Sequence, residues 1–198
     1  QARSGGVGSF TADNFPVFDY LKPNVYGILD SNHGYKMIGV GKEVARVICG
    51  DSAPLLIENY SVSPDQRHLL LFTNSQRVWR QNTRGDFWAL DLSTWQLRKL
   101  GGPGAAPSTL MFAKFSPDGG RVAYVREHDL YVEDLADGHI TRLAHDGSRT
   151  IINGTFDWVY EEELNLRHGF RWSPAGRRIA FGQLDDSGVG DFNLINDT

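Results

Sequence analysis

The chain has 198 residues, of which 40% are hydrophobic and 22% charged, proportions that are typical of a folded globular protein and exclude a disordered or collagen-like one. Its net charge of -4, with scattered basic residues, offers no basic surface for nucleic acid, so we expect no nucleic-acid partner. No stretch approaches the roughly 18 apolar residues of a membrane span, no signal-peptide segment opens the chain at Gln1, and the single cysteine, Cys49, excludes an internal disulfide.

Residues 1–55 are the least regular part of the chain. A glycine-rich start is followed by two apolar stretches, Phe15 to Tyr20 and Met37 to Ile48, that predict strands. We interpret residues 1–55 as an irregular N-terminal segment that holds a first blade of the architecture that the rest of the chain predicts.

A repeated unit is visible from residue 56 onward. Each copy has a turn of the type Ser-Pro-Asp or Ser-Pro-Ala-Gly, then a basic residue and a short apolar run. The turn serines are Ser63, Ser116 and Ser173, and the apolar runs are 69–72, 122–125 and 179–181. Since proline presets φ and Asp or Gly closes the turn, each copy predicts a turn that leads into a buried strand. Further strands are predicted at 86–92 and 96–100, and again at 129–135 and 140–143.

Several short strands per repeat, with little helix, predict an all-β fold. We expect a partial β-propeller, with about three to four blades of a larger propeller. Residues 56–198 would form these blades, and residues 191–198 would be a strand at an edge that further blades or another chain should cover. We expect Trp88, Trp95 and Trp172 to lie in the blade cores.

Two of the repeats contain extra residues. The turn serines are 53 and 57 residues apart, compared with about 40 to 50 residues in common blades. The surplus falls at 74–85 in the first repeat and, after the last strand of the second repeat, at 144–169. Because binding groups are commonly placed on insertions in a rigid scaffold, we expect these two segments to carry function.

The second insertion contains the acidic run 157–163, which reads Asp-Trp-Val-Tyr-Glu-Glu-Glu. We expect Asp157 to cap a short helix whose first turn holds Tyr160 and Glu161 and which ends near His168–Gly169. Neighbouring carboxylates in a partly dry site raise each other's pKa, and a bound ammonium or guanidinium relieves that cost. The run therefore indicates a receptor for a cation, with a solvated acidic helix turn as the alternative.

The segment 153–164, reading Asn-Gly-Thr-Phe-Asp-Trp-Val-Tyr-Glu-Glu-Glu-Leu, resembles the glutamate-rich helix of the dipeptidyl peptidase IV family. These proteins are serine exopeptidases in which a propeller covers an α/β-hydrolase domain. Upstream, Val-Trp-Arg-Gln-Asn-Thr at 78–83 resembles the arginine loop of the family, and 183–192 is similar to its bacterial members. The resemblance covers about Ile57 to Thr198, whereas residues 1–55 match poorly.

The resemblance implies a substrate site on the two insertions. Glu162 and Glu163 would hold the free α-ammonium of a peptide, and Arg80 would contact its first backbone carbonyl and orient the glutamates. The supporting residues would be Trp79, Trp158, Tyr160 and Glu161. Arg80 could instead be a surface arginine stacked on Trp79, and the other two aromatic residues could be packing that fixes the helix.

The function implied is that of the substrate-recognition part of an exopeptidase that releases N-terminal X-Pro or X-Ala dipeptides. No Gly-x-Ser-x-Gly elbow occurs, and none of the six histidines has a recognisable triad setting. We therefore expect the catalytic triad and the hydrolase domain to be absent from this chain, which alone would be inactive. The histidines show no metal-ligand spacing, and the Asp-rich segment 185–191 lacks the final glutamate of an EF-hand, so we expect no metal and no cofactor.

The expected partners are peptide N-termini, the remaining blades and the hydrolase domain, and a homodimer stays open. The family resemblance implies a periplasmic or secreted location, with a cytoplasmic one as the alternative. A second function class is a non-catalytic propeller that binds peptides or proteins. An oligopeptidase relative would share the architecture, but the intact glutamate triplet argues against it.

Overall fold

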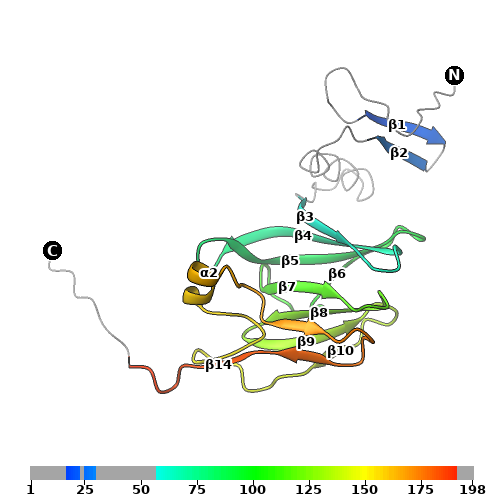
Figure 1. Ribbon diagram of the computed structural model, residues 1–198. Helices are drawn as coiled ribbons and strands as arrows, with labels where there is room; N and C mark the ends of the chain where they lie inside the picture. Colours follow the sequence, from blue (N-terminus) through cyan, green and yellow to red (C-terminus); the bar gives the residue numbers. More distant parts are fainter. Residues whose placement is uncertain (1–16, 23–24, 30–56, 191–198) are drawn as a thin grey trace, which may run out of the picture. The chain divides into compact units, whose positions relative to one another are not determined.

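The structure is a computed structural model that describes residues 17–22, 25–29 and 57–190 (Figure 1). The chain divides into two compact units, Gln1–Asn59 and Tyr60–Thr198. In the first unit, β1 (Val17–Lys22) and β2 (Val25–Leu29) form an antiparallel hairpin. A strand was predicted close to β1, whereas β2 was not predicted. The strands predicted at Met37 to Ile48 and at 191–198 lie outside the described residues.

An eight-stranded sheet contains the first two repeats. Its strands are β3 (Ile57–Val62), β4 (His68–Arg77), β5 (Asn82–Asp91), β6 (Leu97–Lys99), β7 (Leu110–Phe115), β8 (Arg121–Arg126), β9 (Asp129–Asp134) and β10 (Ile140–Arg142). The order of neighbours is β10-β9-β8-β7-β5-β4-β3, with β6 paired to β5. Each predicted strand of these two repeats is therefore confirmed, and the pairs with a described register are antiparallel.

The third repeat is smaller in the part of the chain that the structure describes. It contains β11 (Ile151–Asn153), α2 (Trp158–Leu164), β12 (Phe170–Trp172), β13 (Ile179–Phe181) and β14 (Gln183–Asp185). β12 pairs with β13, and β14 returns to pair with β11. The chain is thus mostly β-strand, with repeated antiparallel units, as an all-β propeller requires.

The three repeat turns have the same hydrogen bonds. Each turn serine donates its backbone amide to the carbonyl five residues later, at 2.9 Å for Ser63 and 2.8 Å for Ser116 and Ser173. The amide of that later residue donates to the serine Oγ at 2.9, 3.0 and 3.1 Å, respectively. The serine therefore fixes the start of each second strand, which is why the same sequence pattern recurs.

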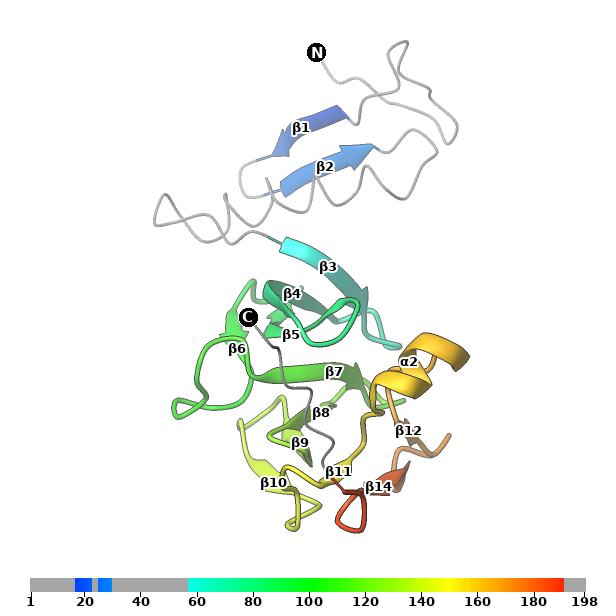
Figure 2. The same cartoon turned by 90° about the vertical axis from the view of Figure 1, so that its left-hand side faces the viewer.

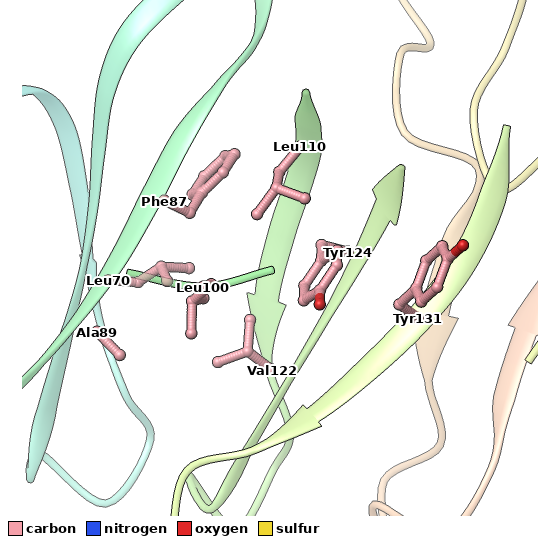
Figure 3. Packing of buried hydrophobic residues seen from close by; sticks show 8 residues of the cluster. All are labelled: Leu70, Phe87, Ala89, Leu100, Leu110, Val122, Tyr124 and Tyr131. Carbon is pink, nitrogen blue, oxygen red and sulfur yellow. The ribbon is translucent and has the colours of Figure 1, made fainter. Parts of the chain in front are cut away.

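β8 is buried on both of its faces. Val122 and Tyr124 point into a core shared with residues of β4, β5, β7 and β9 and with Leu100, which follows β6 (Figure 3). Ala123 and Val125 belong to a second core, which includes Phe170 of β12. Because successive side chains of a strand point to opposite faces, β8 lies between two layers, as a strand in a stack of blades does.

The prediction that three tryptophans lie in the blade cores is confirmed for Trp172 alone, through its contact with a core cluster. Trp88 and Trp172 are partly buried, and Trp172 packs against the second core. The prediction for Trp95 is wrong, because its surface is 47% exposed and its φ is 60°, in the turn between β5 and β6.

The residues of the predicted first insertion, 74–85, form most of a long hairpin arm. β4 continues to Arg77 and β5 starts at Asn82, so only four residues form the tip. Arg84 and Gly85 also pair with β7, which joins the first two repeats into one sheet. A side chain at residue 85 would lie 2.4 Å from the ring of Phe72, which explains the glycine at this position.

Candidate functional site

α2 is a two-turn helix with defined ends. Asp157 caps it as predicted, because its Oδ1 accepts a hydrogen bond from the Tyr160 amide at 3.1 Å. The prediction that the helix ends near His168–Gly169 is wrong, since it ends at Leu164. Asn165 adopts the left-handed conformation, with φ of 53°, and terminates the helix there.

The tip of the β4–β5 arm reaches α2. The tip is a turn over 78–81, closed by a hydrogen bond of 3.1 Å from the Val78 amide to the Gln81 carbonyl. Arg77 Nε donates to the Trp79 carbonyl at 2.9 Å, which further fixes the turn. α2 lies at one end of the strands of this unit in both views (Figures 1 and 2).

Arg80 forms a bidentate ion pair with Glu162. Its Nε is 2.7 Å from Oε2 of the carboxylate, and its Nη2 is 2.9 Å from Oε1. The Arg80 backbone amide donates to Oε1 of Glu161 at 3.2 Å. Two consecutive glutamates therefore hold one arginine. Glu161 binds the backbone amide of Arg80, and Glu162 binds its guanidinium.

The three glutamates have different surroundings. Glu161 is 7% exposed and faces the arm, whereas the Glu162 side chain is 32% exposed. Glu163 is exposed and makes no ion pair with any residue that the structure describes. The guanidinium of Arg80 supplies one cation for the triplet. Two negative charges of the triplet therefore remain without a cation among the described residues.

The aromatic residues singled out from the sequence lie on the same two elements, the tip of the arm and α2. Tyr160 is partly buried and stacks on Phe156, with ring centroids 4.9 Å apart and an interplanar angle of 12°. It therefore helps to fix the helix. Trp79 on the arm and Trp158 on α2 are 44% and 45% exposed, which leaves large apolar surfaces beside the glutamates.

The segment that carries α2 is closed at its base by three glycines. The Gly169 amide donates to the Gly154 carbonyl at 2.8 Å, and the Gly182 amide donates to the Gly169 carbonyl at 2.8 Å. The Gly154 amide donates to the Gly182 carbonyl at 2.9 Å, which completes a ring of three hydrogen bonds. An isolated bridge between Thr155 and His168 continues this pairing toward the helix.

A buried polar network fixes the start of the same segment. Asn153 is fully buried, and its Nδ2 donates to Asp146 at 2.9 Å and to Asp129 at 3.3 Å. Its Oδ1 accepts from Gln183 Nε2 at 2.9 Å, and Asp129 also pairs with Arg142. Both hydrogen-bonding ends of the amide are thus used, so the side chain cannot rotate without breaking them.

The sequence reasoning did not assign a role to these supporting residues. Asn153 and Gly154 open the motif that resembles the family helix, and Gly169 lies at the end of the predicted insertion. Gly154 and Gly169 flank the helix on both sides, which is a usable signal for a closed base. Their partner Gly182 lies between β13 and β14 and has no such signal.

Among residues 17–22, 25–29 and 57–190, no group of three histidine, cysteine or acidic side chains could hold a metal ion. The described part of the chain also has no helix that is long and apolar enough to cross a membrane.

Comparison with known proteins agrees with the resemblance of the motifs. The family model described as the dipeptidyl peptidase IV N-terminal region matches residues 63–198. Dipeptidyl aminopeptidase B of Saccharomyces cerevisiae is 35% identical over 140 residues, which cover 70% of this chain and 16% of the yeast protein. The crystal structure of Porphyromonas gingivalis dipeptidyl peptidase 4 superposes with a TM-score of 0.64 at 30% identity, covering 72% of this chain and 20% of that one. The chain thus spans a small part of the length of these relatives.

Proposed function

Since the chain belongs to the dipeptidyl peptidase IV family, as its N-terminal region, we propose that it selects the substrate of a dipeptidyl peptidase. The proposed reaction is the release of X-Pro or X-Ala dipeptides from free peptide N-termini by a serine-type exopeptidase. Glu162 and Glu163 bind the α-ammonium of the peptide, and Arg80 orients Glu162 and contacts the first carbonyl of the substrate.

The ion pair between Arg80 and Glu162 carries this proposal. It engages one oxygen of the carboxylate with each guanidinium nitrogen, and each oxygen retains a lone pair for an ammonium donor. Glu163 follows on the same helix with no ion pair among the described residues. The guanidinium offsets the charge of Glu162, Glu161 is buried against the arm, and the exposed charge of Glu163 is therefore the one available to an ammonium.

Such a site selects for a free N-terminus. An acylated amine has lost its charge and two of its donors, so it leaves the carboxylates without a cation in a partly desolvated site.

The test uses a full-length peptidase that contains this chain. We expect Glu162→Gln combined with Glu163→Gln to lower kcat/KM for a free N-terminal X-Pro substrate by at least about a hundredfold, because the charged partners of the ammonium are lost. Glu127→Gln, at an exposed turn outside the site, is the matched control and should keep the wild-type value.

An N-acetylated substrate completes the design. In the wild type it should be a poor substrate, and the double variant should lower its kcat/KM little further, since the amine that the glutamates bind is already blocked. An equal loss for the free and the acetylated substrate would contradict ammonium binding by these glutamates.

A further inference from the structure

Four basic side chains lie together just beyond α2. They are Lys114 on β7, Arg167 and His168 in the connection that follows α2, and Arg171 on β12, and we call them the cationic cluster. Arg171 Nη1 is 2.7 Å from His168 Nδ1. Lys114 Nζ is 4.9 Å from the ring centroid of Phe170 and 3.5 Å from its carbonyl oxygen.

The cationic cluster has no acidic partner in the part of the chain that the structure describes. The ion pairs found there involve other arginines and lysines. Arg167 donates through Nη2 to Asn165 at 2.6 Å, but its Nε is buried without a hydrogen-bond partner. Lys114 is half-buried, and the hydrogen bond found for its ammonium among the described residues is the long one to the Phe170 carbonyl. Arg167 and Lys114 therefore have hydrogen-bond donors that lack a good acceptor among the described residues.

The electrostatics of the cluster agree with this geometry. Burial, together with the charge of Arg171, lowers the pKa of Lys114 to about 8. Burial, Lys114 and Arg171 also lower the pKa of His168 below its ordinary value. Positive charges that disfavour one another in this way are stabilised when an anion binds among them.

The location of the cluster connects it with the site on α2. His168 forms the bridge with Thr155, which lies two residues before the helix cap Asp157. The ring of Phe112 on β7 meets His168 edge-on, with ring centroids 6.1 Å apart. A peptide whose N-terminus is held on α2 therefore has the cationic cluster close to the base of the same segment.

We propose that the cationic cluster binds a carboxylate of the peptide substrate, on a residue that follows the N-terminal dipeptide. This inference rests on the proposed function. Arg171 presents a planar guanidinium that suits a carboxylate, and Lys114 supplies a second, less solvated positive charge. The orphan Nε of Arg167 would gain an acceptor.

The experiment measures peptide affinity by calorimetry with a full-length protein that contains this chain. The peptides carry a free N-terminus and a single Asp at the third, fourth, fifth or sixth position, and each is paired with the peptide that has Asn there. We expect one Asp peptide to bind about five times more tightly than its Asn partner, with a ratio that falls as salt is added. Lys114→Met and Arg171→Gln should each reduce this ratio toward one. Arg177→Gln removes one exposed positive charge elsewhere and should leave it unchanged.

Three results would overturn the proposal. One is a wild type that binds Asp and Asn peptides equally at every position, and another is a preference that survives Lys114→Met and Arg171→Gln. The third is a preference that Arg177→Gln reduces as much as Arg171→Gln does, because general charge attraction would then explain it. A failure of the proposed function would be seen in a different comparison. The Asn peptides would then bind the wild type and the Glu162→Gln, Glu163→Gln double variant with the same affinity.

Discussion

The backbone amide of Gly169 donates a hydrogen bond of 2.8 Å to the carbonyl oxygen of Gly154, across the two ends of the segment that carries α2. A Cβ at residue 169 would lie 3.1 to 3.3 Å from backbone atoms of Gly154 and Thr155. At residue 182, the third member of the ring, it would lie 3.7 Å or more from its neighbours. The two glycines thus make similar hydrogen bonds but differ in the space around them.

Gly169→Ala should therefore displace the base of α2, whereas Gly182→Ala should not. We expect Gly169→Ala to destabilise the protein by about 1 to 3 kcal/mol and to raise KM for a free N-terminal substrate, because both glutamates move with the helix. Gly182→Ala should change stability by less than about 1 kcal/mol and leave KM unchanged. Thermal unfolding and steady-state kinetics measure the two effects. A wild-type KM in a folded Gly169→Ala protein would show that the ring does not position the site.

We expect Glu161 to affect substrate binding indirectly, by holding the tip of the arm, and not by contact with the substrate. It is buried and accepts the Arg80 amide, so Glu161→Ala leaves this amide without its acceptor, at a cost of about 1 to 3 kcal/mol. We expect a lower Tm and a higher KM in Glu161→Ala. Glu161→Gln retains a carbonyl oxygen at the same place and should restore most of both losses. Equal effects of the Ala and Gln variants would indicate that the charge of Glu161, and not its hydrogen bond, matters.

Local hydrogen-bonding signals explain which parts of the fold could be predicted from the sequence. The Ser-Pro turns and the Asp157 cap depend on side chains that form hydrogen bonds with the backbone a few residues away. A short stretch of sequence is therefore enough to predict them. The end of α2 was misplaced because Asn165, a less common left-handed residue than glycine, terminates it before Gly169.

Contacts between distant segments were predictable only in part. Arg80 and Glu162 are separated by 82 positions, and physical reasoning placed opposite charges on two insertions without pairing them. The family resemblance supplied the pairing. The ring of Gly154, Gly169 and Gly182 requires β11 to pair with β14, a register that no local pattern encodes.

Glu133 should make stability depend on pH in the acidic range. It is 2% exposed and accepts the Gly101 amide at 2.9 Å, and burial raises its pKa above the ordinary value of 4.5. Above pH 4.5 the unfolded chain loses this proton before the folded one does, so the folded state loses stability as the pH rises through the raised pKa. Glu133→Gln removes this loss. We expect its Tm, relative to wild type, to rise between pH 4.5 and 7, and a Tm difference that stays constant over this range would contradict the expectation.

Lys114 should have the opposite dependence, in the alkaline range. Its pKa is about 8 in the folded protein and about 10.5 in the unfolded chain, mainly because the ammonium is half-buried. Between these values the unfolded chain binds more protons, so wild-type stability contains a contribution that increases with pH.

Lys114→Met has a similar volume and no charge, so its Tm should exceed that of wild type at pH 7 and the gap should close as the pH approaches 10.5. Lys99→Met makes the same chemical change at a lysine that is 3.0 Å from Asp86, and it should lower the Tm at pH 7 because it leaves a buried carboxylate unpaired. Calorimetry of the three proteins between pH 7 and 10.5 measures both effects. A Lys114→Met protein less stable than wild type at pH 7 would mean that the folded protein already compensates this charge, and the cationic cluster would then need no added carboxylate.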